Sequence, residues 1–263
     1  GEQIGDPVSY EGEIAQTDFG DAWSALAANG YQGFFHKMLP DYMGTNLLDE
    51  ATLNEVTERY RGRVEKLATQ VGDGCELICV LIPSSMTTYP ELVPDIYQKA
   101  TGKTKFDQTK EALEAAGVTV IDMRDTFTAH KNDALPLYYR QDSHWADYGA
   151  YLAYVDLFDY ISDRYPDAAP RKFNAFEWEW KYYTGGDMAY YFGVDEVEGG
   201  TCYEYTYQRF MNFEVPQAMS GIKRYKRQNS MAYSSYGDVI VNGGTFKTDR
   251  PTLPDVYVFR NSY

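Results

Sequence analysis

The sequence has little positive charge and no long apolar run. Its 263 residues carry 24 Lys and Arg against 39 Asp and Glu, which gives a formal net charge of −15 and a pI near 4.6. This balance argues against nucleic-acid binding, because phosphate recognition needs clustered Lys and Arg. The longest apolar run is the six residues 77–82, so the sequence predicts no transmembrane helix. The opening Gly1-Glu2-Gln3 does not resemble a signal peptide and indicates a trimmed start.

Cysteine and histidine are also scarce, with 3 of each. Cys75 and Cys79 fall in one expected strand at positions i and i+4, about 13 Å apart, which is too far for a disulfide. We therefore expect both to be unpaired and unreactive. No Cys and His have the spacing of zinc ligands, so the sequence predicts no metal site. Aromatic residues are abundant: at 16% of the chain, they indicate a packed protein and exclude disorder.

A unit of helix, glycine and strand occurs twice in the first half of the chain. Residues 49–71 place apolar side chains at three- and four-residue intervals after a possible N-cap at Asp49, which predicts an amphipathic helix. The apolar run 75–82 that follows is typical of a buried, parallel strand. The pattern returns as a helix, a glycine and a strand at 104–116, Gly117 and 118–123. Two such units predict an α/β fold with a mostly parallel sheet.

The second half opens with a helix and then changes in composition. Apolar spacing predicts a helix over 147–165, ended by prolines. Residues 171–250 are rich in Tyr, Trp and Phe and are broken by Gly pairs, which predicts short antiparallel strands and loops. The apolar stretch 255–259 predicts a third core strand in the same sheet. We therefore interpret residues 1–263 as a single α/β domain in which 171–250 is a Tyr-rich insertion.

Among the three histidines, His144 is the strongest candidate for chemistry. His36 and His130 lie in irregular or polar surroundings that favour packing or solvent exposure. His144 follows a loop, precedes the predicted helix and stands two positions after Asp142. That spacing can put both side chains on one side of an extended segment, where the carboxylate orients the imidazole and stabilises its protonated form. The alternative is a plain helix start at which Asp142 or Ser143 is the cap.

Several serines could supply a nucleophile for such a pair. Ser262 follows the predicted strand 255–259 directly, at a strand-to-loop turn of the kind that lifts a hydroxyl above a sheet edge. Ser84 and Ser85 follow the first predicted strand and remain in reserve. Position therefore favours Ser262.

The residues that flank the pair are candidates for substrate binding. Tyr139 and Arg140 precede it and Trp145 follows it, where the indole could shield the pair from water. Arg140 and Arg124 could each hold a carboxylate or an oxyanion, although an ordinary surface ion pair is the simpler expectation for both.

The block Y-Y-R-Q-D-S-H-W at 138–145 resembles the signature of the DHHW proteins and of the related polysaccharide O-acetyltransferases of the AlgX and AlgJ type. Other pieces match in the same order along the chain: the amphipathic helix, I-P-S-S-M-T-T-Y-P at 82–90, I-D-M-R at 121–124, G-G-D-M-A at 185–189 and R-N-S-Y at 260–263. The resemblance covers roughly residues 40–263.

This resemblance implies a three-layer, SGNH-hydrolase-like domain with a circularly permuted order of motifs. It implies that Ser262 is the nucleophile, His144 the general base and Asp142 its orienting acid, with no cofactor. The implied function is transfer of O-acetyl groups to a cell-surface or exported polysaccharide, or removal of such esters. The implied setting is extracytoplasmic, with a membrane-bound acyl-donor protein as partner.

The chain departs from the family pattern at its end. Asn261 stands where the family carries Asp before the serine. Relatives continue well past the serine, so we expect a further C-terminal part after residue 263. These departures favour an alternative from another class, a non-catalytic polysaccharide-binding or scaffold protein of the cell surface.

Overall fold

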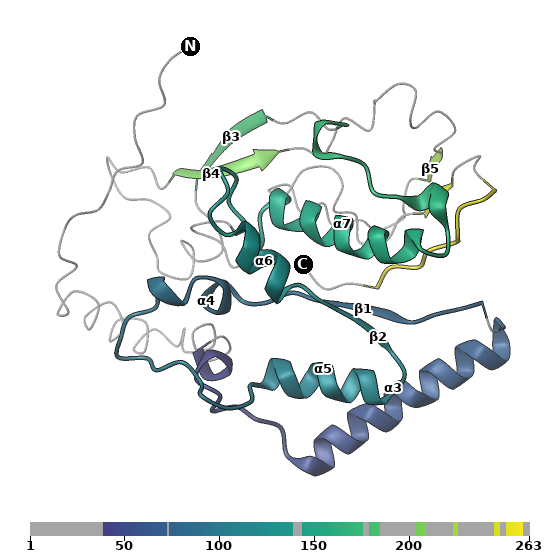
Figure 1. Ribbon diagram of the computed structural model, residues 1–263, viewed down its shortest axis with the longest axis horizontal. Coiled ribbons are helices and arrows are strands. Elements are labelled where there is room, and N and C mark those ends of the chain that lie inside the picture. Colours follow the sequence, from purple (N-terminus) through teal and green to yellow (C-terminus); the bar gives the residue numbers. More distant parts are fainter. Residues whose placement is uncertain are drawn as a thin grey trace.

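The computed structural model describes residues 39–72, 74–138, 144–175, 179–184, 203–208, 223–225, 245–247 and 251–259. Its centre is a parallel pair of strands with helices on both faces (Figure 1). Helices α3 (Glu50–Gln70) and α5 (Lys105–Ala115) cover one face. Helices α6 (Arg124–His130) and α7 (Asp147–Ser162) cover the other. This arrangement of three layers confirms the predicted α/β fold class.

The two central strands are shorter than the sequence predicted. Strand β1 (Ile78–Leu81) pairs in parallel with β2 (Thr119–Asp122), with Ile78 opposite Thr119 and Leu81 opposite Asp122. Side chains alternate between the two faces: Val80 packs toward α7, whereas Cys79 and Leu81 pack toward α3 and α5. Cover on both faces explains why the parallel strands are apolar without a break.

The helices that flank these strands begin and end where local chemistry requires. The Asp49 carboxylate accepts the backbone N–H of Thr52 at 2.7 Å and caps α3, as predicted. Thr104 and Asp107 form a reciprocal capping box at the start of α5. Gly117 follows α5 with φ of 83°, a conformation that glycine adopts without strain, and turns the chain into β2.

The two faces of the sheet carry cores of different size. On the α3 side, Leu113, Ala116 and Val118 form a small buried cluster. Tyr60 and Val64 of α3 pack against this cluster, yet no residue of α3 is itself buried. On the α7 side, eight buried residues form a larger core: Met123, Phe127, Leu137, Tyr138, Tyr148, Tyr151, Leu152 and Ala153. The main core therefore lies around the first half of α7.

Several short elements complete the described chain. A helical turn covers residues 39–42, and α4 (Ser85–Thr88) follows β1. Single 3₁₀ turns form η1 (Pro90–Leu92), η2 (Pro166–Ala168) and η3 (Phe173–Ala175). Helix α7 ends before the predicted Tyr165, and Pro166 opens η2. The sequence did not predict α6, whose last turn it interpreted as a polar loop around His130.

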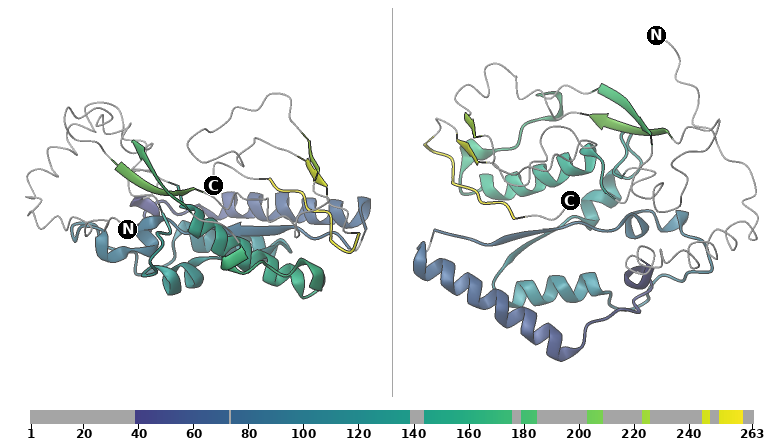
Figure 2. Two further views of the ribbon diagram at one scale, coloured as in Figure 1. Left: turned by 90° about the horizontal axis from the view of Figure 1, so that it is seen from above. Right: turned by 180° about the vertical axis from the view of Figure 1, so that it is seen from behind.

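Within the Tyr-rich segment 171–250, the described residues include two antiparallel strand pairs. Strand β3 (Glu179–Thr184) pairs with β4 (Tyr203–Gln208), and β5 (Lys223–Tyr225) pairs with β6 (Thr245–Lys247). Both pairs lie on the α7 side of the molecule (Figures 1 and 2). Short antiparallel strands within 171–250 are what the alternating aromatic pattern predicted.

The prediction of a core strand at 255–259 is wrong. Residues 251–259 carry no strand and pair with none of the described strands. The apolar side chains from Val256 to Phe259 are exposed, Tyr257 to 83% and Phe259 to 93%. The segment runs in the same general direction as β1 in all three views, but it does not join the sheet (Figures 1 and 2). An apolar run forms a core strand only where a neighbouring strand and a covering layer are available, and the described residues supply neither here.

Cys75 and Cys79 are both free, as predicted. Only Cys79 belongs to β1, whereas Cys75 lies in the turn before it, with its N–H donating to the carbonyl of Gly72 at 3.1 Å. Burial raises the pKa of the Cys79 thiol and so lowers the fraction of reactive thiolate. The low reactivity predicted for both cysteines therefore has a physical basis at Cys79, and it stays a prediction at Cys75.

Candidate active site

His144 lies next to a backbone pairing between residues 137–138 and 145–146. Tyr138 and Trp145 form an antiparallel bridge, and the N–H of Ala146 donates to the carbonyl of Leu137 at 2.8 Å. His144 directly precedes this pairing and is buried, with 8% of its surface exposed. Tyr139, Arg140 and Asp142 lie outside the described residues, so the predicted contact between Asp142 and His144 stays a prediction.

This pairing lies beside the carboxyl end of β1. The hydroxyl of Tyr138 donates to the carbonyl of Pro83 at 2.6 Å, two residues after β1 ends. The Tyr138 hydroxyl also lies 3.2 Å from the Thr88 hydroxyl in α4. The flank of His144 is therefore fixed to the sheet edge at which α/β enzymes of open-sheet type place their sites.

Gly149 allows the first turn of α7 to lie directly against this pairing. A β-carbon at position 149 would stand 2.6 Å from the carbonyl oxygen of Leu137 and 3.3 Å from the ring of Phe127. The glycine is thus needed for close approach of helix and strand, a role that its place inside an apolar helix did not reveal.

Trp145 is half-buried and packs against the core around α7. The indole therefore has a structural role in packing, and its contact with substrate stays a prediction.

The two reserve serines take part in the start of α4. Ser84 is the N-cap of this helix, and its hydroxyl accepts the N–H of Thr87 at 3.2 Å and lies 3.0 Å from the Thr87 hydroxyl. Ser85 is the first residue of the helix. Capping accounts for the serine at position 84 without a catalytic role.

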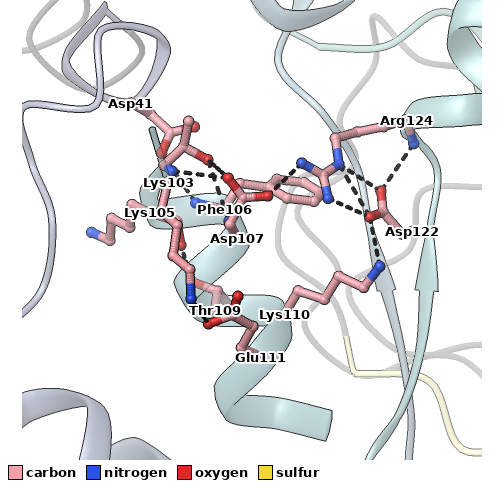
Figure 3. Close-up of polar contacts among 11 residues, drawn as sticks. Asp41, Lys103, Lys105, Phe106, Asp107, Thr109, Lys110, Glu111, Asp122 and Arg124 are labelled. Atoms are coloured by element: carbon pink, nitrogen blue, oxygen red, sulfur yellow. Dashed lines mark hydrogen bonds and ion pairs between the residues drawn. The ribbon is translucent and has the colours of Figure 1, made fainter. Parts of the chain in front are cut away.

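Arg124 forms ion pairs with carboxylates of the protein, which confirms the simpler of the two expectations for this residue. Its guanidinium donates to both oxygens of Asp122, at 2.7 Å for the shortest contact, and to Asp107 at 2.6 Å (Figure 3). Lys110 reaches Asp122 at 3.2 Å, and the guanidinium stacks 4.5 Å from the centre of the Phe106 ring. These contacts tie the carboxyl end of β2 to the first turn of α5.

The charges of this cluster shift its ionisation. Burial alone would raise the pKa of the Asp107 and Asp122 carboxyls, but hydrogen bonds outweigh it, from Thr104 and Arg124 to Asp107 and from Arg124 and Lys110 to Asp122. The pKa of each carboxyl is therefore below its ordinary value. Such carboxylates stabilise the fold at neutral pH, and the stabilisation is lost as the pH falls below about 4 and through their folded pKa values.

Replacing Arg124 with leucine should lower the free energy of unfolding at pH 7 by about 2 kcal/mol, because two partly buried carboxylates each lose a charged donor. The loss should shrink at pH values where the carboxylates are protonated. Urea unfolding at a series of pH values measures both effects. Lys103→Met is the matched control, because it removes only the exposed pair with Glu111 and should change little. Equal losses in the two variants would contradict the prediction.

A second group of titratable side chains lies beside the start of α7. His130 ends α6, and its Nδ1 lies 2.7 Å from Asp133 and 3.3 Å from the hydroxyl of Tyr148. The Tyr148 hydroxyl donates to Asp133 at 2.5 Å. Burial and this hydrogen bond raise the pKa of Tyr148, and hydrogen bonds from Tyr148 and His130 lower that of Asp133. The His130 side chain is exposed to 41%, so the predicted surface position is confirmed.

Comparison with known proteins assigns the chain to a family. The family model for the SGNH hydrolase-like domain of the acetyltransferase AlgX matches residues 40–225, a stretch that includes Asp142 and His144 and ends before Ser262. No curated protein matches the chain.

Two solved structures are similar to the chain. The O-acetyltransferase domain of Pseudomonas putida AlgJ is 16% identical, with 61% of this chain and 58% of that one covered and a TM-score of 0.43. A DHHW family protein from Eubacterium siraeum is 18% identical, with 57% and 47% covered and a TM-score of 0.41. The chain thus spans less than two thirds of either. Because the family match covers more than half of its residues, the chain belongs to the family of SGNH hydrolase-like domains of the acetyltransferase AlgX.

Proposed function

We propose that this protein transfers acetyl groups to hydroxyls of a cell-surface or exported polysaccharide, or removes them, through Ser262, His144 and Asp142. The observation that carries the proposal is the family match, which spans the Asp142–His144 block. The position of the flanks of His144 at the carboxyl end of β1 supports it. Ser262 enters through its place in the sequence and lies outside the described residues.

In the proposed mechanism His144 takes the hydroxyl proton of Ser262 while the serine oxygen attacks the acetyl carbonyl of the donor. The donor's leaving group departs with that proton, and the acetyl group remains on Ser262 as an ester. A sugar hydroxyl then attacks the ester, gives its proton to His144 and takes the acetyl group, and the proton returns to Ser262. With water in place of the sugar, the same steps release acetate. Asp142 orients the imidazole and stabilises its charged form in both halves.

The substrate and the setting are part of the same proposal. Tyr139, Arg140 and Trp145 would bind the sugar beside the acetyl group. A membrane-bound protein would deliver the acetyl group outside the cytoplasm, as the resemblance implies. Among the described residues, the structure contains no helix that is both long and apolar enough to cross a membrane.

The proposal is tested by acetyl capture. The protein is incubated with p-nitrophenyl acetate, and the modified residue is located by peptide mass spectrometry. We expect an acetyl group on Ser262 of the wild-type protein under rapid quench, and continued turnover when the reaction is left to run. Acetylation confined to lysines, with no p-nitrophenol released beyond the buffer rate and the one equivalent that accompanies each acetyl-lysine, would overturn the proposal.

A second candidate is a polysaccharide-binding protein without catalysis. The exposed segment 255–259 favours it, because the residues before Ser262 are not anchored in the sheet. Asn261 in place of the family's Asp favours it too. Retention on immobilised polysaccharides, with no acetyl exchange in the capture assay, would support this candidate over the first.

A further inference from the structure

Two side-chain hydroxyls and two backbone carbonyls meet in the core where β1 ends. The Tyr138 hydroxyl donates to the carbonyl of Pro83 at 2.6 Å. With that proton engaged, Thr88 is the donor of the contact between the two hydroxyls at 3.2 Å, a proton it shares with the carbonyl of Ser84 at 3.3 Å. Tyr138 is 7% exposed and Thr88 2% exposed, so these bonds are shielded from water. Shielded hydrogen bonds define geometry tightly, because a broken one leaves a buried polar group without a partner.

The ring of Tyr138 is held as firmly as its hydroxyl. Tyr89 packs edge-on at 6.2 Å between ring centres, and Phe127 at 5.6 Å. The backbone of Tyr138 bridges to Trp145, which follows His144 directly. A single residue thus connects the carboxyl end of β1, through its hydroxyl, to the backbone next to His144.

We propose that Tyr138 is a positioning residue that sets where His144 stands relative to the sheet edge. The inference rests on the proposed function for its effect on turnover, but its effect on the His144 ring does not depend on that function. Loss of the Tyr138 hydroxyl removes its hydrogen bonds to Pro83 and Thr88. The backbone of Tyr138, which bridges to Trp145, is then held less tightly. The His144 imidazole then shifts relative to the groups that it must reach, while substrate contacts elsewhere are kept. A small misplacement of a base lowers turnover far more than binding.

The test is Tyr138→Phe, which keeps the ring and removes the hydroxyl. We expect kcat to fall about tenfold with little change in KM, in line with the cost of a misplaced catalytic group. Tyr151→Phe is the matched control: Tyr151 lies in the same core and also loses a hydroxyl bonded to a backbone carbonyl, that of Arg171 at 3.2 Å. Its kcat and KM should stay close to those of the wild type.

The imidazole signals of His144 in NMR spectra report on the surroundings of the ring and do not depend on enzyme activity. The chain has 3 histidines, so His36→Gln and His130→Gln variants assign the His144 signals. These signals should move in Tyr138→Phe and stay in Tyr151→Phe. If the wild-type protein shows no acetyl transfer, the proposed function fails, and the NMR comparison still decides on Tyr138.

Two outcomes would overturn the inference. One is a Tyr138→Phe variant with unchanged His144 signals; the other is an equal change in the Tyr151→Phe variant. Should Tyr138→Phe fail to fold, Thr88→Val and Thr88→Ser replace it. The valine removes the buried hydroxyl and should move the His144 signals, whereas the serine keeps it and should not. Unchanged signals in Thr88→Val would then contradict the proposal.

Discussion

Replacing His144 with glutamine should lower the turnover of acetyl esters by roughly 10⁴-fold, the scale seen when one member of a Ser-His-Asp triad is removed. Glutamine cannot take the proton of Ser262, so the serine remains a weak nucleophile. It is chosen over alanine because His144 is buried. An alanine would leave a cavity next to Trp145 and confuse loss of chemistry with loss of packing.

The matched control for this variant is His130→Gln. His130 has a carboxylate neighbour at 2.7 Å, as His144 is predicted to have, but it lies at the exposed end of α6. Its removal should leave turnover unchanged. Hydrolysis of p-nitrophenyl acetate and thermal unfolding are measured on both variants. An active His144→Gln protein, or an equal loss in His130→Gln, would remove His144 from the mechanism.

Replacing Gly149 with alanine should destabilise the protein by about 3 kcal/mol, within the range for overpacked core positions. The added β-carbon would stand 2.6 Å from the carbonyl oxygen of Leu137, a residue with no exposed surface. Neither the backbone nor the Phe127 ring on the other side can move away cheaply. The backbone at Leu137 must shift, and the hydrogen bond from the Ala146 N–H to the Leu137 carbonyl weakens.

The matched control is Gly62→Ala in α3, where a β-carbon meets nothing within 4 Å. The same substitution there should stabilise the protein by about 0.5–1 kcal/mol, because alanine is the better helix former. Urea unfolding of both variants measures the contrast. Stabilisation by Gly149→Ala would show that α7 does not pack against Leu137 in this way.

The parts of the fold that the sequence predicted are those encoded by local signals. Asp49 and Gly117 mark helix ends, the first through a side-chain cap and the second through its backbone conformation, and each acts as expected. The parallel pairing of β1 and β2 followed from two apolar runs between helices. The candidate base could likewise be found from D-x-H spacing before a helix.

The parts that failed depend on partners that a sequence does not name. Residues 255–259 have the composition of a core strand, but no described strand pairs with them. The sequence favoured an ordinary ion pair for Arg124, but it did not identify Asp107, 17 positions away, as one of the partners. The need for glycine at 149 arises from the Leu137 carbonyl of another segment. Such contacts join residues distant in sequence, and no local pattern reports them.

The absence of any buried residue in α3 has a consequence for how this domain fluctuates. Elements with few buried apolar contacts open locally at lower free energy than the core does. Helix α3 packs against the small cluster only through partly buried side chains such as Tyr60 and Val64. Helix α7, in contrast, buries Tyr148, Tyr151 and Leu152 in the main core. The amide hydrogens of α3 therefore exchange with solvent through openings that leave α7 closed, and the surroundings of His144 belong to the slowly exchanging part.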